Sequence, residues 1–121
     1  MLNVKPTVYN ALTTACPTAS VSDEHPKEWK TFPKVTFTEE QNAVELWTDN
    51  EEKDARIVIR VDVWDKTNTS PIAAAVDGAM SALGFQRTLA MDVPVQELYK
   101  HKQMRYEAIV SVDTQDVFHQ F

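Results

Sequence analysis

The most regular stretch of this sequence is ARIVIRVDVWD, which covers residues 55–65. Every second position carries a β-branched aliphatic side chain, and these positions are Ile57, Ile59, Val61 and Val63. The positions between them are more mixed and carry Arg56, Val58, Arg60, Asp62 and Trp64. An alternation with a period of two predicts a β-strand with one dry face and one wetter face. Burial of the aliphatic face would contribute about 1.5–3 kcal/mol per residue before the entropy of ordering is subtracted.

A turn and then a helix are predicted directly after this strand. Residues 67–69 form the turn, and Ser70 is expected to cap a helix over residues 70–83, with Pro71 at its first position. Gly84 stands where a glycine commonly ends a helix. The apolar face of this helix is formed by Ile72, Ala75, Val76, Ala79, Met80 and Leu83. Because several of these side chains are alanines, we expect the helix to lie close to its sheet.

Another helix is predicted near the start of the chain, over residues 4–15. Pro6 suits its first turn. Its apolar face is formed by Val8, Ala11, Leu12 and Ala15. Cys16 precedes Pro17, and the residue before a proline avoids the helical region, so the helix is expected to end there.

The remaining regular segments are predicted to be strands. One strand is expected over residues 34–38, another over 104–113, and shorter extended pieces over 19–22 and 43–47. A strand over 85–93 would carry Phe85, Arg87, Leu89 and Met91 on one side. The segments between the strands are predicted to be a polar loop over 23–33, a polar connection with room for a helical turn over 95–103, and a short tail over 114–121.

This order of elements predicts an α+β fold. Hairpin-like connections favour a mainly antiparallel sheet of about four to five strands, with two helices on one face, in a two-layer sandwich. The length predicts a single domain over residues 1–121, carrying an acidic arm over 39–54 and the tail over 114–121. The second face of the sheet is mixed, so it could be solvated or covered by a neighbouring molecule.

Composition excludes several classes of function. Only two of the 121 residues are glycines, Gly78 and Gly84, and neither stands in the frame of a dinucleotide-binding or phosphate-binding loop. Eighteen acidic residues against twelve basic ones leave a net charge of −6, which argues against a nucleic-acid reader that works by neutralising phosphates. The single cysteine, Cys16, allows no internal disulfide. No stretch reads as a signal peptide or a membrane span, so we expect a soluble protein made in the cytoplasm.

The side chains that could carry metal or catalytic chemistry form no recognisable set. Asp23, Glu24, His25 and Glu28 are the one cluster of carboxylates with an imidazole, but their spacing matches no metal signature. His101 stands between two lysines and Cys16 at a helix end, without a partner motif around either of them. Because no acid, base and nucleophile can be assembled, we expect neither an enzyme nor a metal or cofactor site.

Two groups of residues are better candidates for contacts with partners. The acidic arm would be either a solvated hairpin or a surface that repels phosphate, and its carboxylates are Glu39, Glu40, Glu45, Asp49, Glu51, Glu52 and Asp54. Aromatic side chains outside the regular elements suit protein contacts, and those we assign here are Trp29, Phe32, Phe118 and Phe121.

The order and spacing of five segments resemble those of the small tail-completion or tail-terminator proteins of long-tailed bacteriophages. VKPTVYNAL, residues 4–12, is similar to the opening helix of that family, and FPKVTF, residues 32–37, is similar to its proline-led strand. IVIRVDVWD, residues 57–65, resembles its most typical strand. Residues 70–83 then match the following helix, and residues 106–112 the closing strand. The longer acidic arm and the polar segment 96–103 depart from some members.

The resemblance implies a structural role. Such proteins form a ring, commonly a hexamer, at the head-proximal end of the tail tube in the virion, after assembly in the cytoplasm of a bacterial host. The ring stops tube polymerisation and meets the head connector, while DNA passes through its lumen without specific binding. On this basis we assign one half of a subunit interface to Arg56, Arg60, Trp64 and Trp47, while the acidic arm either supplies the other half or lines the lumen. A head-completion adaptor or stopper is the main alternative, and a small cellular binding module is a further one.

Overall fold

The computed structural model describes residues 3–23, 32–48, 51–94, 99–111 and 117–118, with side chains for all of these except 45–48, 51–53 and 117–118. Two helices and six strands follow one another along these residues. In chain order they are α1 (Lys5–Ala15), β1 (Ser20–Asp23), β2 (Lys34–Thr48), β3 (Glu51–Asp65), α2 (Ser70–Ala82), β4 (Gln86–Val93), β5 (Lys100–Ser111) and β6 (Val117–Phe118).

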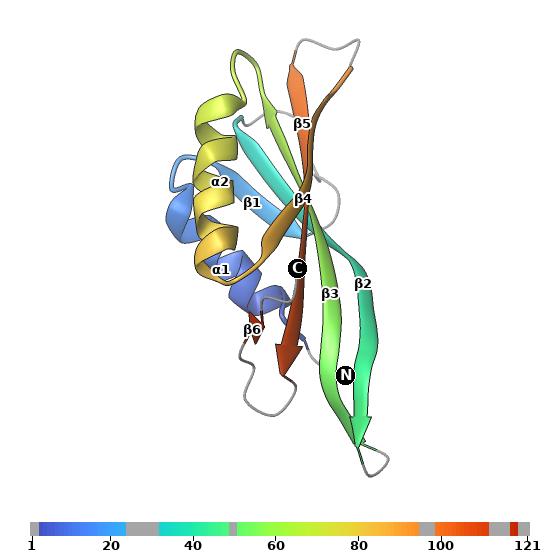
Figure 1. Ribbon diagram of the computed structural model, residues 1–121. Helices are drawn as coiled ribbons and strands as arrows, with labels where there is room; N and C mark the ends of the chain where they lie inside the picture. The colour runs from blue at the N-terminus through green and yellow to red at the C-terminus, as the bar shows by residue number, and fades with distance from the viewer. Residues whose placement is uncertain (1–2, 24–31, 49–50, 95–98, 112–116, 119–121) are drawn as a thin grey trace.

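The strands form one sheet, and both helices lie on the same face of it (Figure 1). The sheet order is β1-β2-β3-β5-β4, and β6 pairs with the end of β5 beyond β4. Only the β1–β2 pair is parallel among the described strands, and the others are antiparallel. The structure therefore confirms the predicted α+β fold with two helices over one face of a mainly antiparallel sheet.

The aliphatic alternation of β3 lies at the centre of the core. Ile57, Ile59, Val61 and Val63 are completely buried, as predicted. They pack with α1, α2 and the neighbouring strands through Val8, Leu12, Phe37, Val76, Met80 and Tyr106. Cys16 also belongs to this core, and burial raises the pKa of its thiol.

Polar contacts also join α2 to the strands beneath it. The Tyr106 hydroxyl on β5 donates a hydrogen bond to Asp77 of α2, with an O···O distance of 3.0 Å. Arg87 on β4 also pairs with Asp77, at 3.3 Å. Burial, together with the negative charge of Asp77, raises the pKa of Tyr106. One helix residue thus anchors two adjacent strands.

The ends of α2 confirm one prediction and correct another. Gly84 adopts a φ of 95°, which only glycine reaches without strain, and it follows the helix as predicted. The predicted cap was wrong: Thr69 is the N-cap residue, and Ser70 is already inside the helix. The N–H of Ser70 donates a hydrogen bond to the side-chain oxygen of Asn68, at 3.0 Å. Asn68, rather than Ser70, therefore provides a side-chain acceptor at the start of the helix.

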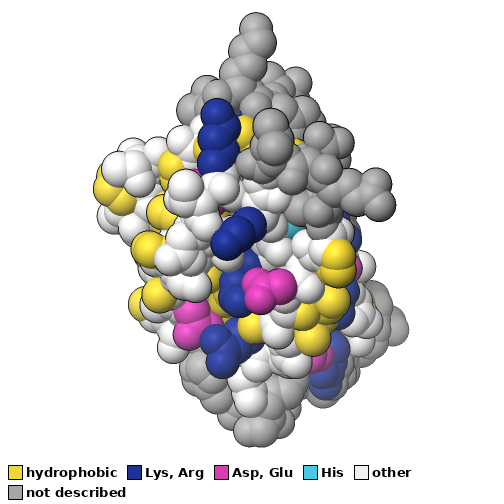
Figure 2. All heavy atoms as spheres, turned by 90° about the horizontal axis from the view of Figure 1, so that it is seen from above, with side chains coloured by type: hydrophobic (Ala, Val, Ile, Leu, Met, Phe, Trp, Pro, Cys, Tyr) yellow, Lys and Arg dark blue, Asp and Glu magenta, His cyan; other side chains and the backbone are white. Residues whose placement is uncertain are grey.

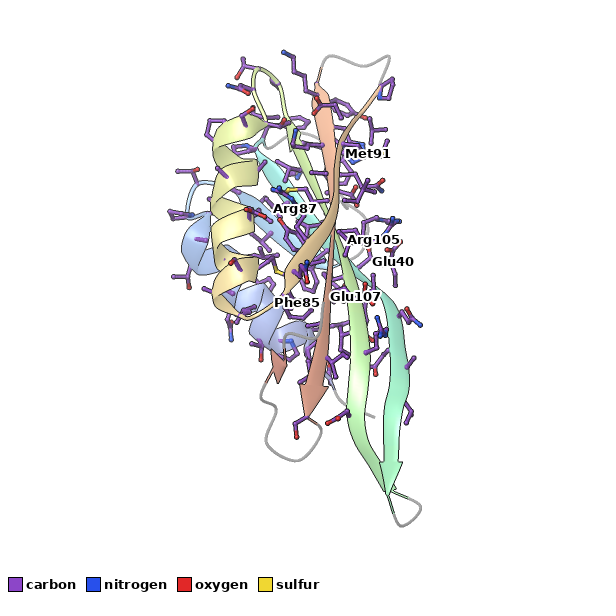
Figure 3. All side chains as sticks on the ribbon, viewed as in Figure 1. Glu40, Phe85, Arg87, Met91, Arg105 and Glu107 are labelled. Atoms are coloured by element: carbon purple, nitrogen blue, oxygen red, sulfur yellow. The ribbon has the colours of Figure 1, made fainter. Side chains whose placement is uncertain are left out.

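Three strand predictions were wrong, two in the strand boundaries and one in the side of the sheet on which the side chains lie. The pieces at 34–38 and 43–47 are one continuous strand, β2, because its pairing with β3 continues across irregular positions such as Glu40. The segment 100–103 is not a connection but the start of β5. A bulge between Arg87 and Leu89 breaks the alternation of β4, so Phe85 and Arg87 face the helices whereas Met91 faces away (Figure 3).

Candidate interaction surface

The face of the sheet opposite the helices is the surface to which the sequence assigned a subunit interface. On β3 this face carries Arg56, Val58, Arg60, Asp62 and Trp64. Neither described helix covers it (Figure 1), yet Asp62 is only 3% exposed and Trp64 only 6% exposed. Their burial points to contacts within the chain, which the register of the sheet supplies.

Glu40 joins two arginines from different strands on this open face. The carboxylate accepts hydrogen bonds from the Arg105 guanidinium of β5, with N···O distances of 2.5 and 3.2 Å (Figure 3). The Arg60 guanidinium of β3 lies 3.6 Å from the same carboxylate. A register shift in β2 between Glu39 and Gln41 leaves Glu40 as the extra residue. The hydrogen bond that Arg105 donates to Glu40 raises the pKa of Arg105.

Asp62 extends this network to the far end of the face. Arg60 donates to one oxygen of the Asp62 carboxylate at 3.0 Å, and the His101 imidazole contacts the other oxygen at 2.8 Å. The His101 ring also stacks on Trp64, with 4.5 Å between ring centroids and 18° between the ring planes. The register of β3 with β5 places Trp64 beside His101. These contacts tie the end of β3 to the beginning of β5.

The structure therefore brings three of the four predicted interface residues onto one face but also gives them partners in the chain. Arg56 pairs with Glu107 of β5, Arg60 pairs with Glu40 and Asp62, and Trp64 stacks on His101. Trp47 belongs to β2, and its side chain lies outside the described residues. The interface assignment stays a prediction, and a partner would meet ion-paired arginines there.

The predicted acidic arm is the outer part of the β2–β3 hairpin, which extends beyond the helical layer (Figure 1). Two of its carboxylates belong to the body of the sheet: Glu40 joins the arginines, and Glu39 accepts a hydrogen bond from Asn42 at 3.5 Å. Asp54 lies on β3 opposite Ser111. The remaining carboxylates have side chains outside the described residues, and these are Glu45, Asp49, Glu51 and Glu52.

Of the aromatic residues assigned to partner contacts, some have described side chains and others do not. Phe32 stacks on Tyr99 with 5.6 Å between ring centroids, and the Lys66 ammonium lies 5.6 Å from the Phe32 centroid. Phe118 belongs to β6, opposite Ile109, with its side chain outside the description. Trp29 and Phe121 lie outside the described residues. Phe32 is thus half-buried against its own chain.

The candidate metal cluster is represented in the structure by a single member. Asp23 ends β1 and pairs with Lys5 of α1 at 3.4 Å, so its carboxylate holds the first strand to the first helix. Glu24, His25 and Glu28 lie outside the described residues. Within the described part of the chain, no three side chains of metal-binding type lie close enough together to hold a metal ion.

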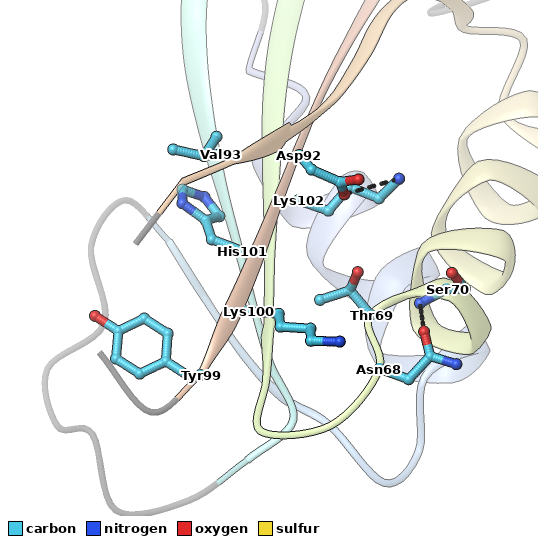
Figure 4. A pocket seen from close by; sticks show the side chains of 9 residues that line it. All are labelled: Asn68, Thr69, Ser70, Asp92, Val93, Tyr99, Lys100, His101 and Lys102. Carbon is cyan, nitrogen blue, oxygen red and sulfur yellow. Dashed lines mark hydrogen bonds and ion pairs between the residues drawn. The ribbon is translucent and has the colours of Figure 1, made fainter. Parts of the chain in front are cut away.

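A polar cavity of about 540 Å³ lies between the start of α2 and the paired strands β4 and β5 (Figure 4). Its wall includes hydroxyl, amide, imidazole and ammonium groups, contributed by Asn68, Thr69, Ser70, Tyr99, Lys100, His101 and Lys102, together with Asp92 and Val93. This site was not predicted from the sequence, because residues 100–103 were expected to be a connection rather than the start of β5. The Lys-His-Lys run was the available signal, and only the pairing of β5 places it beside α2.

Comparison with known proteins yields no family: no family model matches the chain, and no curated protein matches it. Among the described helices, none has the length and apolar character needed to cross a membrane.

Proposed function

We propose that this protein is a structural subunit of a phage tail, which forms a ring at the head-proximal end of the tail tube, ends tube polymerisation and joins the tail to the head connector. The observation that carries the proposal is the long β2–β3 hairpin, which continues beyond the helical layer (Figure 1). The last fully buried residue along β3 towards the hairpin end is Ala55 among those described. An arm that extends past its own core suits contact with another subunit.

The edge of the sheet at β4 supports association of the same kind. Met91 is 43% exposed, and Leu89 and Val93 beside it on the open face are half-buried. An edge strand presents unpaired backbone groups to a neighbouring chain, and apolar side chains next to such an edge favour protein contact. The hairpin and the β4 edge are different surfaces, as a head-to-tail ring requires.

The ring proposal is tested on the purified full-length chain. We expect light scattering to report a closed oligomer with a mass that reaches a plateau as concentration rises, and electron microscopy to show rings. The ring added to polymerising tail-tube protein should cap the tubes and shorten their length distribution. A monomer at every concentration, with no effect on tube length, would overturn the proposal.

Binding to isolated partners separates the tail-terminator role from that of a head-completion adaptor. A terminator binds tube ends in the absence of the connector, whereas an adaptor binds the connector in the absence of the tube. Sedimentation of the protein with each partner alone measures this directly. Genes for a major tail protein and a connector beside the gene for this chain would support the same assignment.

A further inference from the structure

The cavity beside α2 has the features of a site for an anionic group. Lys100 and Lys102 both line it, and among the described residues Lys100 forms no ion pair. Lys102 pairs with Asp92 at 3.2 Å, but the Asp92 side chain is 79% exposed, where such a pair is weak. The start of α2 adds the partial positive charge of a helix N-terminus.

A hydroxyl at the wall of the same cavity adds a second group that could contact a ligand. Thr69 is only 6% exposed, and its side chain makes no capping hydrogen bond to α2. Within the described part of the chain, its hydroxyl has no hydrogen-bond partner. Because Thr69 lines the cavity, an oxygen-bearing ligand there could accept a hydrogen bond from this hydroxyl. Figure 4 shows Thr69 between Lys100 and Ser70 at the cavity wall.

The charged ends of the molecule lie opposite each other. The cavity is at the end where α2 and β5 begin, whereas β2 and β3 meet at the other end (Figure 1). Seen from the cavity end, Lys and Arg side chains run in a column down the middle of the described surface (Figure 2). Residues 45–54 at the hairpin end carry five carboxylates and one lysine in the sequence.

We propose that the cavity bounded by Thr69, Lys100 and Lys102 binds the acidic hairpin end, residues 45–54, of a second copy of this chain. The inference rests on the proposed ring, because it names the contact that joins neighbouring subunits. A contact between opposite ends of the molecule is head-to-tail, which is the kind of interface that closes into a ring. The acidic segment of the chain matches the cationic cavity in charge, and its carboxylates are acceptors to which the lysines and the Thr69 hydroxyl could donate.

A peptide carboxylate fits this cavity better than a nucleic-acid backbone does. A phosphate backbone is bound by a run of several cations on one surface. Here the described cavity offers two lysines beside the Asp92 carboxylate, in a chain with a net charge of −6. The hairpin end supplies several carboxylates within one short segment, so it can place acceptors beside both lysines of a small cavity.

Charge-reversed variants test the contact. Lys100→Glu should weaken self-association about tenfold or more, because like charges would then face each other. The double variant Glu51→Lys with Glu52→Lys should weaken it similarly. Mixing the two variants should restore assembly, because each cavity then meets a segment of opposite charge. Lys66→Glu is the matched control, since it makes the same change of charge at an exposed lysine that does not line the cavity. Sedimentation velocity measures all four samples.

Carbodiimide cross-linking of mixed isotope-labelled and unlabelled wild-type chains provides a second readout. The reagent joins an ammonium to a carboxylate in direct contact, forming an amide with loss of water. We expect links between copies from Lys100 to Glu51 or Glu52. Rings that form normally in Lys100→Glu, or wild-type rings without these links, overturn the inference and leave the proposed function intact. A wild-type chain that never associates overturns both.

Discussion

The two faces of β3 are buried by different means. On the helix side, Ile57, Ile59, Val61 and Val63 are buried by apolar contact with both helices. On the open side, Asp62 and Trp64 are almost as deeply buried, but their contacts with His101 of β5 are a polar contact at 2.8 Å and a ring stack. One strand therefore carries two different sources of stability, one on each side.

The difference shows what each kind of contact demands of the sequence. Apolar burial has no preferred direction, so a period of two is enough to place four side chains in the core. A hydrogen bond to a carboxylate requires a particular atom opposite it at close range. Such contacts depend on which residue of the next strand lies alongside, and the register is set by the whole sheet.

The largest effect is expected on the covered face. Ile59→Ala should lower the free energy of unfolding by about 2–5 kcal/mol, because it removes buried methylene groups and leaves a cavity. Val58→Ala, on the half-buried open side, should cost about 1 kcal/mol or less. Chemical denaturation of both variants measures the difference. Equal losses would show that the two faces are equally well packed, and the comparison would fail.

A smaller effect is expected from the ion pairs of the open face. Asp62→Asn should lower stability by about 1–3 kcal/mol, because Arg60 and His101 lose a charged acceptor at a buried position. Asp92→Asn is the control, since its exposed pair with Lys102 should be worth about 1 kcal/mol at most. Denaturation midpoints of the two variants decide the matter. An equal loss of stability in Asp92→Asn and Asp62→Asn would contradict the expectation that burial makes the contacts of Asp62 more stabilising than the exposed Asp92–Lys102 pair.

The smallest effect on stability is expected at Tyr106, an ionisable side chain on the face of the sheet that the helices cover. Tyr106→Phe should cost about 1 kcal/mol at neutral pH, through the lost hydrogen bond to Asp77. The fold raises the pKa of Tyr106, so above pH ~10 the unfolded chain loses this proton while the folded chain keeps it. The stability that Tyr106 contributes is therefore present below that pH and falls as pH rises.

The pH dependence is read as the difference between wild type and Tyr106→Phe. Its limiting slope should be about −1.4 kcal/mol per pH unit, because one proton separates the two states. Unfolding experiments at pH 9, 10 and 11 follow this difference, and the other titrating groups cancel between the two proteins. A difference that stays constant over this range would show that Tyr106 ionises alike in both states.

Local chemistry allowed much of the fold to be predicted. The alternation of residues 55–65 and the helical spacing of 70–83 each concern side chains close together in the sequence, and both elements are observed with small changes at their ends. Gly84 is a further example, because its left-handed backbone is a property of one residue. The start of β5 was missed because Lys100 to Gln103 is polar, and pairing with β3 overrides that local preference.

The residues of the two candidate surfaces were less predictable. Arg60 was placed on the correct face, but nothing near it in the sequence indicated that Glu40 would reach it through a register shift in β2. His101 had no recognisable partner, since Asp62 is 39 positions away along the chain. The cavity at Thr69 and Lys100 required α2 and β5 to be packed together first.

By itself, the sequence determined the α+β class, the strand whose aliphatic face forms the core, and the net charge of −6 with its concentration towards residues 39–54. Only the tertiary structure decided that Arg60 meets Glu40 and Asp62, that Trp64 covers His101, and that two lysines share a cavity with Thr69. The physical reason is the separation along the chain over which each kind of interaction acts. Periodicity and turn chemistry act between neighbours in the chain, whereas ion pairs and cavities form between segments that the sheet register brings together.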